Sequence, residues 1–152
     1  MTVLELGAGA NPLPLADVHH DKETHEGYID IAWDLDVLPW PWENEEFEIV
    51  WAVDVMEHLK VDVNVWLGEC WRILQPGGLL EMRVPAWDHP LSYRDPTHQR
   101  VFHEESFFYW DPRTNLWQDF GRYYFPEERW WNVRDHFMEA NDLRFTLVKL
   151  ET

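Results

Sequence analysis

The chain has 152 residues, a length that fits one domain of ordinary size. Its formal charge is −17 and stays negative even if all eight histidines are protonated, which disfavours tight binding to a phosphate backbone. The composition also excludes a disordered acidic chain, because 45% of the residues are hydrophobic and 16% are aromatic.

The first half of the sequence predicts four strands and one long helix. The apolar run 3–6 stops at the turn formers of residues 7–12, and the run 47–53 predicts a central strand buried on both faces. Apolar residues spaced by three and four form one stripe along the helix, which Pro76-Gly77-Gly78 ends. The predicted elements are strands at 3–6, 16–21, 28–35 and 47–53, and a helix at 57–74.

The second half predicts a fifth strand at 79–85 and an antiparallel hairpin formed by residues 130–139 and 143–150. Residues 86–128 have no clean period, which indicates a long insertion or lid. We therefore expect an α/β protein in a single domain, 1–152. Its sheet is expected to be mostly parallel, with an antiparallel C-terminal edge.

Composition also bears on location. The one cysteine, Cys70, excludes an intrachain disulfide and a zinc site built on several thiolates. No apolar run approaches the ~20 residues that span a bilayer, and no basic-then-apolar leader precedes Val3. We expect a cytoplasmic protein without a membrane span.

Acidic residues and a glycine loop fall directly after predicted strands, at the edge where such sheets bind ligands. A glycine loop after a first strand is typical of nucleotide-like ligands. The dinucleotide fingerprint is disfavoured, because Pro12 stands where its third glycine belongs, and no Gly-Lys-Ser/Thr follows to make a phosphate loop.

Five motifs in order, from Val3 to about Pro85, resemble the class I S-adenosylmethionine-dependent methyltransferases. The likeness is strongest to a small branch whose first motif is a compact Gly-x-Gly-x-Asn-Pro. The motifs are Glu5-Leu6-Gly7-Ala8-Gly9-Ala10-Asn11-Pro12, Asp21, Trp33-Asp34-Leu35, Asp54-Val55-Met56-Glu57-His58-Leu59 and Leu74-Gln75-Pro76-Gly77-Gly78. The resemblance implies a Rossmann-like methyltransferase fold and S-adenosylmethionine as cofactor.

The resemblance also implies roles for single residues. Asp21 would accept the ribose hydroxyls, with Asp17 a weaker candidate, and the alternative for Asp21 is a solvated turn residue. Asp34 and the Leu35 amide would bind adenine, unless Asp34 is a cap or turn residue. The glycines would pass under the methionine moiety, and Glu5 would orient their loop. The expected cofactor-binding residues are Glu5, Gly7, Ala8, Gly9, Asp21, Asp34, Leu35, Asp54 and Val55.

Catalytic candidates lie in two segments. Glu57 and His58 are candidate bases, although this pair often fixes the loop instead. His89 and His98 are candidate bases or acceptor-orienting groups, since histidine titrates near neutrality. His98 ends an Asp-Pro-Thr-His segment that the same branch carries and that would overhang the acceptor site.

Two other readings of this segment stay open. One is a structural turn in which Asp95 and Thr97 cap backbone donors. The other is a metal site formed by His89, Asp95, His98 and His103, but their spacing matches no dedicated metal motif, so no metal is expected.

The sequence departs from full-size members in having no helix before the first strand or between the first two strands. One sheet face would then lack part of its helical cover. Trp40-Pro41-Trp42 and Trp130-Trp131 could fill the gap, or a second subunit could, which predicts a homodimer. The tryptophans between Trp87 and Trp117 are expected to line the acceptor cleft.

We expect methyl transfer to an unidentified small molecule or protein rather than to nucleic acid. Two alternatives are a non-catalytic S-adenosylmethionine-binding scaffold or regulatory partner, and a tryptophan-rich module that binds sugars or other planar ligands.

Overall fold

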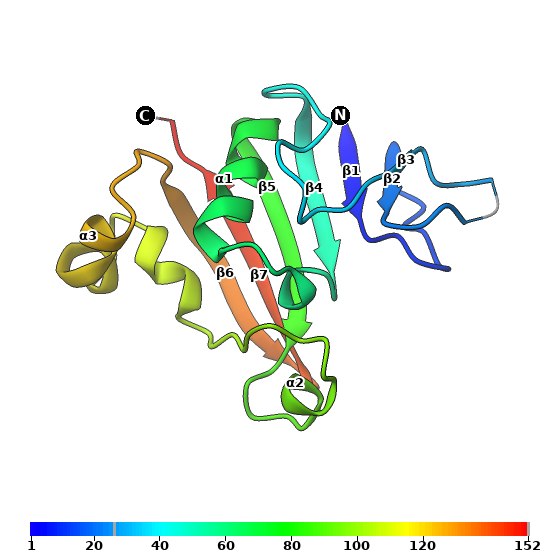
Figure 1. Cartoon of the computed structure of the whole chain (residues 1–152). Coiled ribbons are helices and arrows are strands. Elements are labelled where there is room, and N and C mark those ends of the chain that lie inside the picture. The colour runs from blue at the N-terminus through cyan, green and yellow to red at the C-terminus, as the bar shows by residue number, and fades with distance from the viewer. Residues whose placement is uncertain (26, 152) are drawn as a thin grey trace.

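The computed structural model describes residues 1–25 and 27–151, which build one seven-stranded sheet in the order β3-β2-β1-β4-β5-β7-β6 (Figure 1). Strands β1 to β5 pair in parallel, and β7 runs antiparallel to both β5 and β6. The expected mostly parallel sheet with a C-terminal antiparallel hairpin is confirmed. The strands are β1 (Val3–Leu6), β2 (Val18–Asp21), β3 (Ile31–Ala32), β4 (Phe47–Val53), β5 (Leu74–Pro85), β6 (Trp131–Glu139) and β7 (Asp142–Lys149).

Strands β1 and β4 have the predicted bounds, whereas β3 is much shorter than residues 28–35. It pairs with β2 through two residues only, and the chain then turns, closed by a hydrogen bond of 2.9 Å from the Val37 amide to the Asp34 carbonyl. The turn ends the strand before Asp34 and Leu35. They therefore lie in the loop that follows the strand.

The predicted helix 57–74 is divided. A 3₁₀ turn, η1 (Met56–His58), precedes the helix α1 (Val63–Ile73). Between η1 and α1 the backbone is not helical. There Asp36 Oδ1 accepts hydrogen bonds from the backbone amides of Lys60 at 2.7 Å and Val61 at 3.0 Å. This contact joins residues far apart in the sequence, so the helical period did not reveal it.

The hydrophobic core lies between the sheet and α1. Trp66, Phe107 and Phe145 are fully buried there, and their rings pack edge to face. No helix joins β3 to β4, so this part of the core is covered by the buried indoles of Trp40 and Trp42. Arg72 of α1 donates to both of their carbonyl oxygens and fastens the segment to the helix.

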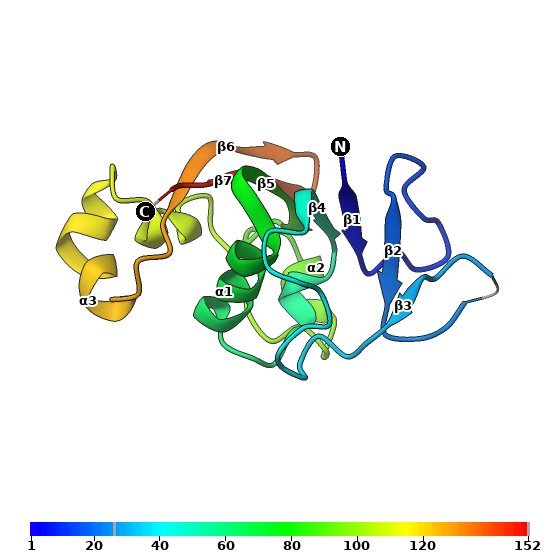
Figure 2. The same cartoon turned by 90° about the horizontal axis from the view of Figure 1, so that it is seen from above.

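The opposite face of the sheet carries no helix in the described part of the chain, as Figure 2 shows. Ile49, Trp51, Leu79 and Val148 point to this face and are half-buried, outside the core cluster. Ile49, Leu79 and Val148 lie side by side on β4, β5 and β7. The prediction that residues 47–53 are buried on both faces is therefore wrong, because no helix of the described residues packs on this face.

The segment after β5 is more ordered than its sequence suggested. It contains the helices α2 (Leu91–Arg94) and α3 (Arg122–Tyr124), the 3₁₀ helix η2 (Ser106–Trp110) and the π-helix η3 (Trp117–Gly121). Phe102 and Phe107 place its middle part in the core. Among the described residues, none of the helices has the length and apolar character needed to cross a membrane.

Candidate functional site

The carboxyl ends of β1, β2, β3 and β4 surround a cavity of about 440 Å³. This is the edge at which α/β sheets bind ligands, and the volume is in the range of cofactor sites. Six of the nine expected cofactor-binding residues line the cavity, namely Gly7, Asp21, Asp34, Leu35, Asp54 and Val55.

The loop after β1 has a backbone that glycine adopts most readily, with φ of +68° at Gly7 and +58° at Gly9. A Cβ atom at Gly7 would collide with the side chain of Val55, so the loops after β1 and β4 pack directly on each other. The Gly7 amide donates to His20 Nδ1 at 3.3 Å, and the Gly9 amide donates to Asp21 Oδ2 at 2.7 Å. The loop is thereby fixed to the end of β2.

The other three expected residues, Glu5, Ala8 and Gly9, do not line the cavity but support it. Glu5 Oε2 accepts hydrogen bonds from the Leu13 amide and from His19 Nδ1, both at 2.8 Å. The structure thus brings Glu5 to the far end of the glycine loop, where its carboxylate orients the backbone.

Two carboxylates of the cavity have lowered pKa values. Burial raises the pKa of Asp21, but the amides of Gly9 and of the two residues that follow Asp21 outweigh it, so the net pKa lies below the ordinary value. The Asp36 amide lowers the pKa of Asp34, and the Lys22 ammonium, 3.2 Å away, adds to this effect. Both carboxylates are therefore ionised at neutral pH.

His20 lines the cavity and was not singled out in the sequence. Its Nδ1 accepts from Gly7, so its Nε2 carries the proton and donates to the Trp33 carbonyl at 2.8 Å. Burial lowers the pKa of His20 and keeps the ring neutral. Two consecutive histidines in a strand were the only signal, and they did not show which of them faces the loop.

A second cavity, of about 560 Å³, adjoins the first and shares Asp54 and His58 with it. Glu57, His98 and Asp95 line it as well. Three of the four expected catalytic residues therefore meet at one cavity beside the cofactor-type cavity. They come from η1 and from the segment after α2.

Glu57 is 2% exposed, and its Oε2 has no hydrogen-bond partner among the described residues. Burial raises the pKa of Glu57 to about 8, with a further contribution from the charge of Asp54. Burial also lowers the pKa of His58, and the neighbouring His98 lowers it further. Both shifts favour the neutral form of each group at neutral pH.

His89 is the expected catalytic residue that lies outside this cavity. Its Nδ1 accepts from the Leu91 amide at 3.2 Å, as in a turn. The metal group weighed above, which joined His89 and His103 to Asp95 and His98, is not assembled among the described residues.

The tryptophans of residues 87–117 do not line the second cavity either. Trp110 packs in the core, and Trp87 lies at the surface, 39% exposed, where its indole donates to Glu104. That prediction was wrong because the middle of the segment completes the core and does not overhang the site.

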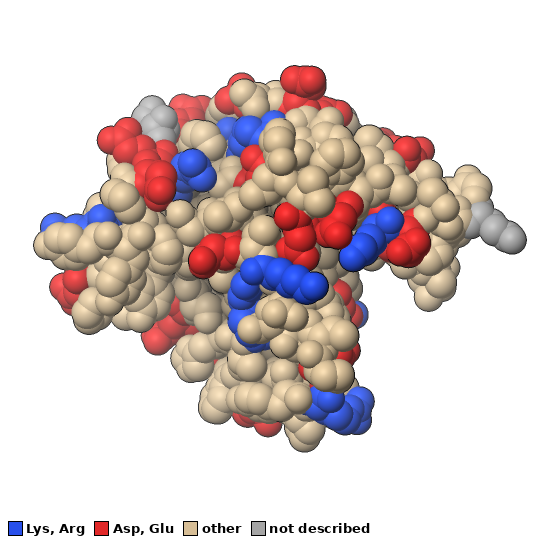
Figure 3. All heavy atoms as spheres, viewed as in Figure 1, with Lys and Arg blue, Asp and Glu red and all other residues tan. Residues whose placement is uncertain are grey.

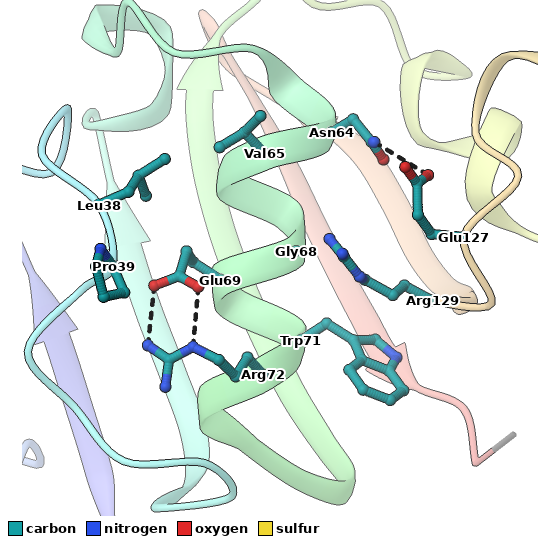
Figure 4. Close-up of a pocket in the computed structure, with 10 residues that line it drawn as sticks. All are labelled: Leu38, Pro39, Asn64, Val65, Gly68, Glu69, Trp71, Arg72, Glu127 and Arg129. Atoms are coloured by element: carbon teal, nitrogen blue, oxygen red, sulfur yellow. Dashed lines mark hydrogen bonds and ion pairs between the residues drawn. The ribbon is translucent and has the colours of Figure 1, made fainter.

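A larger groove of about 610 Å³ runs along α1, away from the strand ends (Figure 4). Figure 4 shows the Glu69–Arg72 ion pair on one side of the helix and Arg129 against Gly68 on the other. None of the predicted site residues lines it. The groove contains neither the glycine loop of the first cavity nor the Glu57–His58–His98 group of the second.

The charge on the surface agrees with the composition. On the face seen in Figure 3, acidic side chains are spread widely and basic ones form small separate groups. No continuous basic strip follows that face, as would be expected for a nucleic-acid acceptor.

The order of the strands, the glycine loop and the cavity at the carboxyl ends define a Rossmann-like domain, a fold class in which nucleoside-type cofactors bind at this edge. Comparison with known proteins identifies the family. The profile of the family described as "Methyltransferase domain" matches residues 7–82, which are half of the chain. The chain belongs to this methyltransferase family.

Relatives and solved structures agree. The ubiquinone biosynthesis O-methyltransferase of Bradyrhizobium sp. (strain ORS 278) is 32% identical over 78 residues, which are 51% of this chain and 29% of that protein. The chain thus spans less than a third of the length of this curated relative.

Two solved structures share the fold. One is a SAM-dependent methyltransferase from Archaeoglobus fulgidus, with a TM-score of 0.61 and 13% identity over 97% of this chain and 85% of that chain. The other comes from a complex of the Haloferax volcanii Trm112 methyltransferase activator with a methyltransferase, with a TM-score of 0.63 and 14% identity over 99% and 83% of the two chains. The expected class I methyltransferase fold is confirmed, as is S-adenosylmethionine as the cofactor of the family.

Proposed function

We propose that this protein transfers a methyl group from S-adenosylmethionine, held in the first cavity, to an acceptor held in the second. The observation that carries this proposal is that the two cavities meet at Asp54 and His58. A methyl donor and an acceptor held on either side of these residues would be adjacent, and alignment of two reactants supplies a large part of such catalysis.

The residues of the first cavity fit this cofactor. Asp21 ends β2 beside the glycine loop, where a carboxylate would accept the ribose hydroxyls. Asp34 and the Leu35 amide would bind the adenine ring. The cofactor supplies an electrophilic methyl group on a positively charged sulfur, and the ionised carboxylates of Asp21 and Asp34 suit that charge.

The residues of the second cavity would bind the acceptor and receive its proton. In the metal-free protein, the nitrogen lone pairs of His58 and His98 would take this proton. Their shared cavity of about 560 Å³ has the volume of a small-molecule site, so we propose a small-molecule acceptor, in agreement with the acidic surface. The name of the Bradyrhizobium relative makes an oxygen acceptor the first class to test.

Calorimetry with S-adenosylmethionine and with its demethylated product tests the first cavity. Binding of both is expected, and binding of neither would contradict the proposal. A labelled-methyl assay over a panel of phenols, alcohols, amines and carboxylates then tests the second cavity. Tight cofactor binding without product from any acceptor would instead favour the non-catalytic scaffold.

We further propose that the protein is cytoplasmic and forms a homodimer. The single cysteine, Cys70, is buried, in keeping with a reducing compartment such as the cytoplasm. The uncovered sheet face would be the contact surface of a homodimer.

A further inference from the structure

Three side chains that line the second cavity, Glu57, His58 and His98, lie close enough together to bind one ion, an arrangement that proton transfer does not require. Glu57, His58 and His98 can each place one nitrogen or oxygen atom within 4.8 Å of the other two. The rings of the two histidines are 4.7 Å apart and nearly perpendicular. A carboxylate and two imidazoles are a donor set that binds zinc-type cations, with a water or substrate at the remaining position.

Hydrogen bonds fix which nitrogen of each ring carries the proton. His98 Nδ1 is 3.3 Å from the Ser92 carbonyl oxygen, which can only accept, so Nδ1 donates. His58 Nδ1 is 2.9 Å from Thr97 Oγ1, and that hydroxyl already donates to Asp95 Oδ1 at 2.7 Å. His58 Nδ1 therefore donates too. In the neutral form of each ring the lone pair is therefore on Nε2.

Glu57 supplies a second, independent sign of a ligand. Its carboxyl group is buried, and its Oε2 has no hydrogen-bond partner among the described residues. Its Oε1 lies 3.9 Å from His58 Nε2, and the residue lines the second cavity. A buried acceptor without a partner costs about 1–3 kcal/mol. A cation bound by this oxygen would remove that cost.

The geometry points to a site for one divalent transition-metal ion of the zinc type, bound by Glu57 and by the Nε2 atoms of His58 and His98. Bonds of about 2.1 Å at tetrahedral angles put two ligand atoms about 3.4 Å apart, so atoms now up to 4.8 Å apart would approach by about 1.4 Å through side-chain rotation. Magnesium and calcium are disfavoured, because they prefer sites made of oxygen atoms.

The hydrogen bonds behind the histidines are those that metal-binding histidines usually have. A histidine that binds metal through one ring nitrogen usually donates the N–H of its other nitrogen to a carbonyl or a carboxylate, and this fixes the orientation of the ring. The hydrogen bond to the carboxylate can be direct or pass through another group. The Ser92 carbonyl does this for His98, and the Thr97–Asp95 pair does it for His58. The Asp-Pro-Thr-His segment thereby provides one ligand and the outer support of another.

The acceptor class follows from this site and, unlike the site itself, rests on the proposed function. A cation beside the methyl donor would lower the pKa of an acceptor hydroxyl that reaches it. Because both histidine lone pairs would then be bound to the ion, the proton of the O–H bond would pass to water and not to His58 or His98, as it would without the ion. The oxygen would bond to the methyl carbon, and the carbon–sulfur bond would break with its electron pair remaining on sulfur. The acceptor is then a phenol or another hydroxyl compound.

The test uses the full chain without an affinity tag, after a chelator has removed any bound metal. The protein is titrated with Co²⁺, and binding is measured by visible absorption. A second titration with Zn²⁺ is measured by calorimetry. One ion per chain is expected, and the Co²⁺ spectrum should report nitrogen ligands. Absence of binding to the wild-type chain would overturn the site.

Variants assign the ligands. His98→Ala and Glu57→Gln should each weaken Zn²⁺ binding at least about 100-fold, and Thr97→Val should weaken it about 10- to 100-fold. His103→Ala is the matched control, because His103 is exposed and pairs with Glu104 outside the cavity. Unchanged affinity in both His98→Ala and Glu57→Gln, with folding checked by circular dichroism, would contradict the assignment.

Cofactor calorimetry on the stripped chain separates this inference from the proposed function. If the wild-type chain binds the cofactor but no Zn²⁺, the metal site alone is overturned. If it binds Zn²⁺ but no cofactor, the proposed function alone is overturned. Equal methylation of hydroxyl acceptors by stripped and Zn²⁺-loaded protein would show that the ion does not assist the acceptor.

Discussion

Asp21 Oδ2 accepts the amide of Gly9 at 2.7 Å, so the carboxylate proposed to bind the ribose also holds the loop proposed to bind the methionine moiety. One side chain thus joins the ends of β1 and β2. Asp21→Asn should weaken S-adenosylmethionine binding about 10- to 100-fold, because hydrogen bonds to a charged group contribute about 1.5–3 kcal/mol. Calorimetry measures this change.

The comparison for this prediction is Asp119→Asn, which neutralises an exposed aspartate in η3, outside both cavities. It should leave the affinity unchanged. His98→Ala should also affect cofactor binding much less than Asp21→Asn does. If His98→Ala abolishes cofactor binding while Asp21→Asn has no effect, the assignment of the two cavities is wrong.

Gly7 tests the contact between the loops after β1 and β4. Gly7→Ala combines a strained φ of +68° with a collision against Val55. Gly77→Ala has similar strain, with φ of +75°, but its Cβ would meet open space. Each should lose about 1–2 kcal/mol of stability from the backbone alone.

Only Gly7→Ala should also reduce cofactor affinity, by at least about tenfold, which corresponds to about 1.4 kcal/mol. Denaturant unfolding and calorimetry measure the two effects on the same samples. A cofactor affinity reduced equally in both variants would mean that the loop acts through global stability.

The strand ends of the site could be predicted because their signals are local. The apolar run 3–6 followed by glycines, and the run 47–53 followed by Asp54, place their polar residues at one edge once the sheet is parallel. The break before α1 could not be predicted, because Asp36 imposes it from another part of the chain.

The second cavity shows the same limit. Glu57, His58 and His98 were each singled out, but the sequence predicted no metal. Their convergence depends on the segment after α2 folding back onto η1, which the Gln99 amide fixes with a hydrogen bond of 2.7 Å to the Glu57 carbonyl. No periodic pattern records a contact across about forty residues.

Glu57 gives the protein a specific pH dependence in the absence of metal. Its pKa is about 8 in the folded state, against 4.5 for the ordinary carboxyl, so the unfolded chain releases this proton at lower pH. The contribution of Glu57 to stability therefore falls as the pH rises from about 4.5 to about 8, by at most about 1.4 kcal/mol per pH unit.

Glu57→Gln should remove this dependence. The free energy of unfolding of the variant, relative to that of the wild type, should increase between about pH 4.5 and about pH 8 and level off above pH 8. Urea unfolding of the chelator-treated proteins, followed by tryptophan fluorescence, measures the difference. The exposed Glu105→Gln serves as control. A difference that does not vary with pH would show that the Glu57 carboxyl is not buried as described.

The uncovered sheet face leads to a prediction about association. Ile49, Leu79 and Val148 form an apolar row on adjacent strands, and burying such a row against a second copy is favourable by about 25 cal/mol per Å² of apolar area. The charge of −17 opposes association, so added salt should strengthen it. Sedimentation equilibrium should therefore show a dimer fraction that increases with protein and salt concentration.

Leu79→Glu should abolish the dimer, while Leu15→Glu, in an exposed loop position, should not. A monomer under all these conditions would contradict the homodimer.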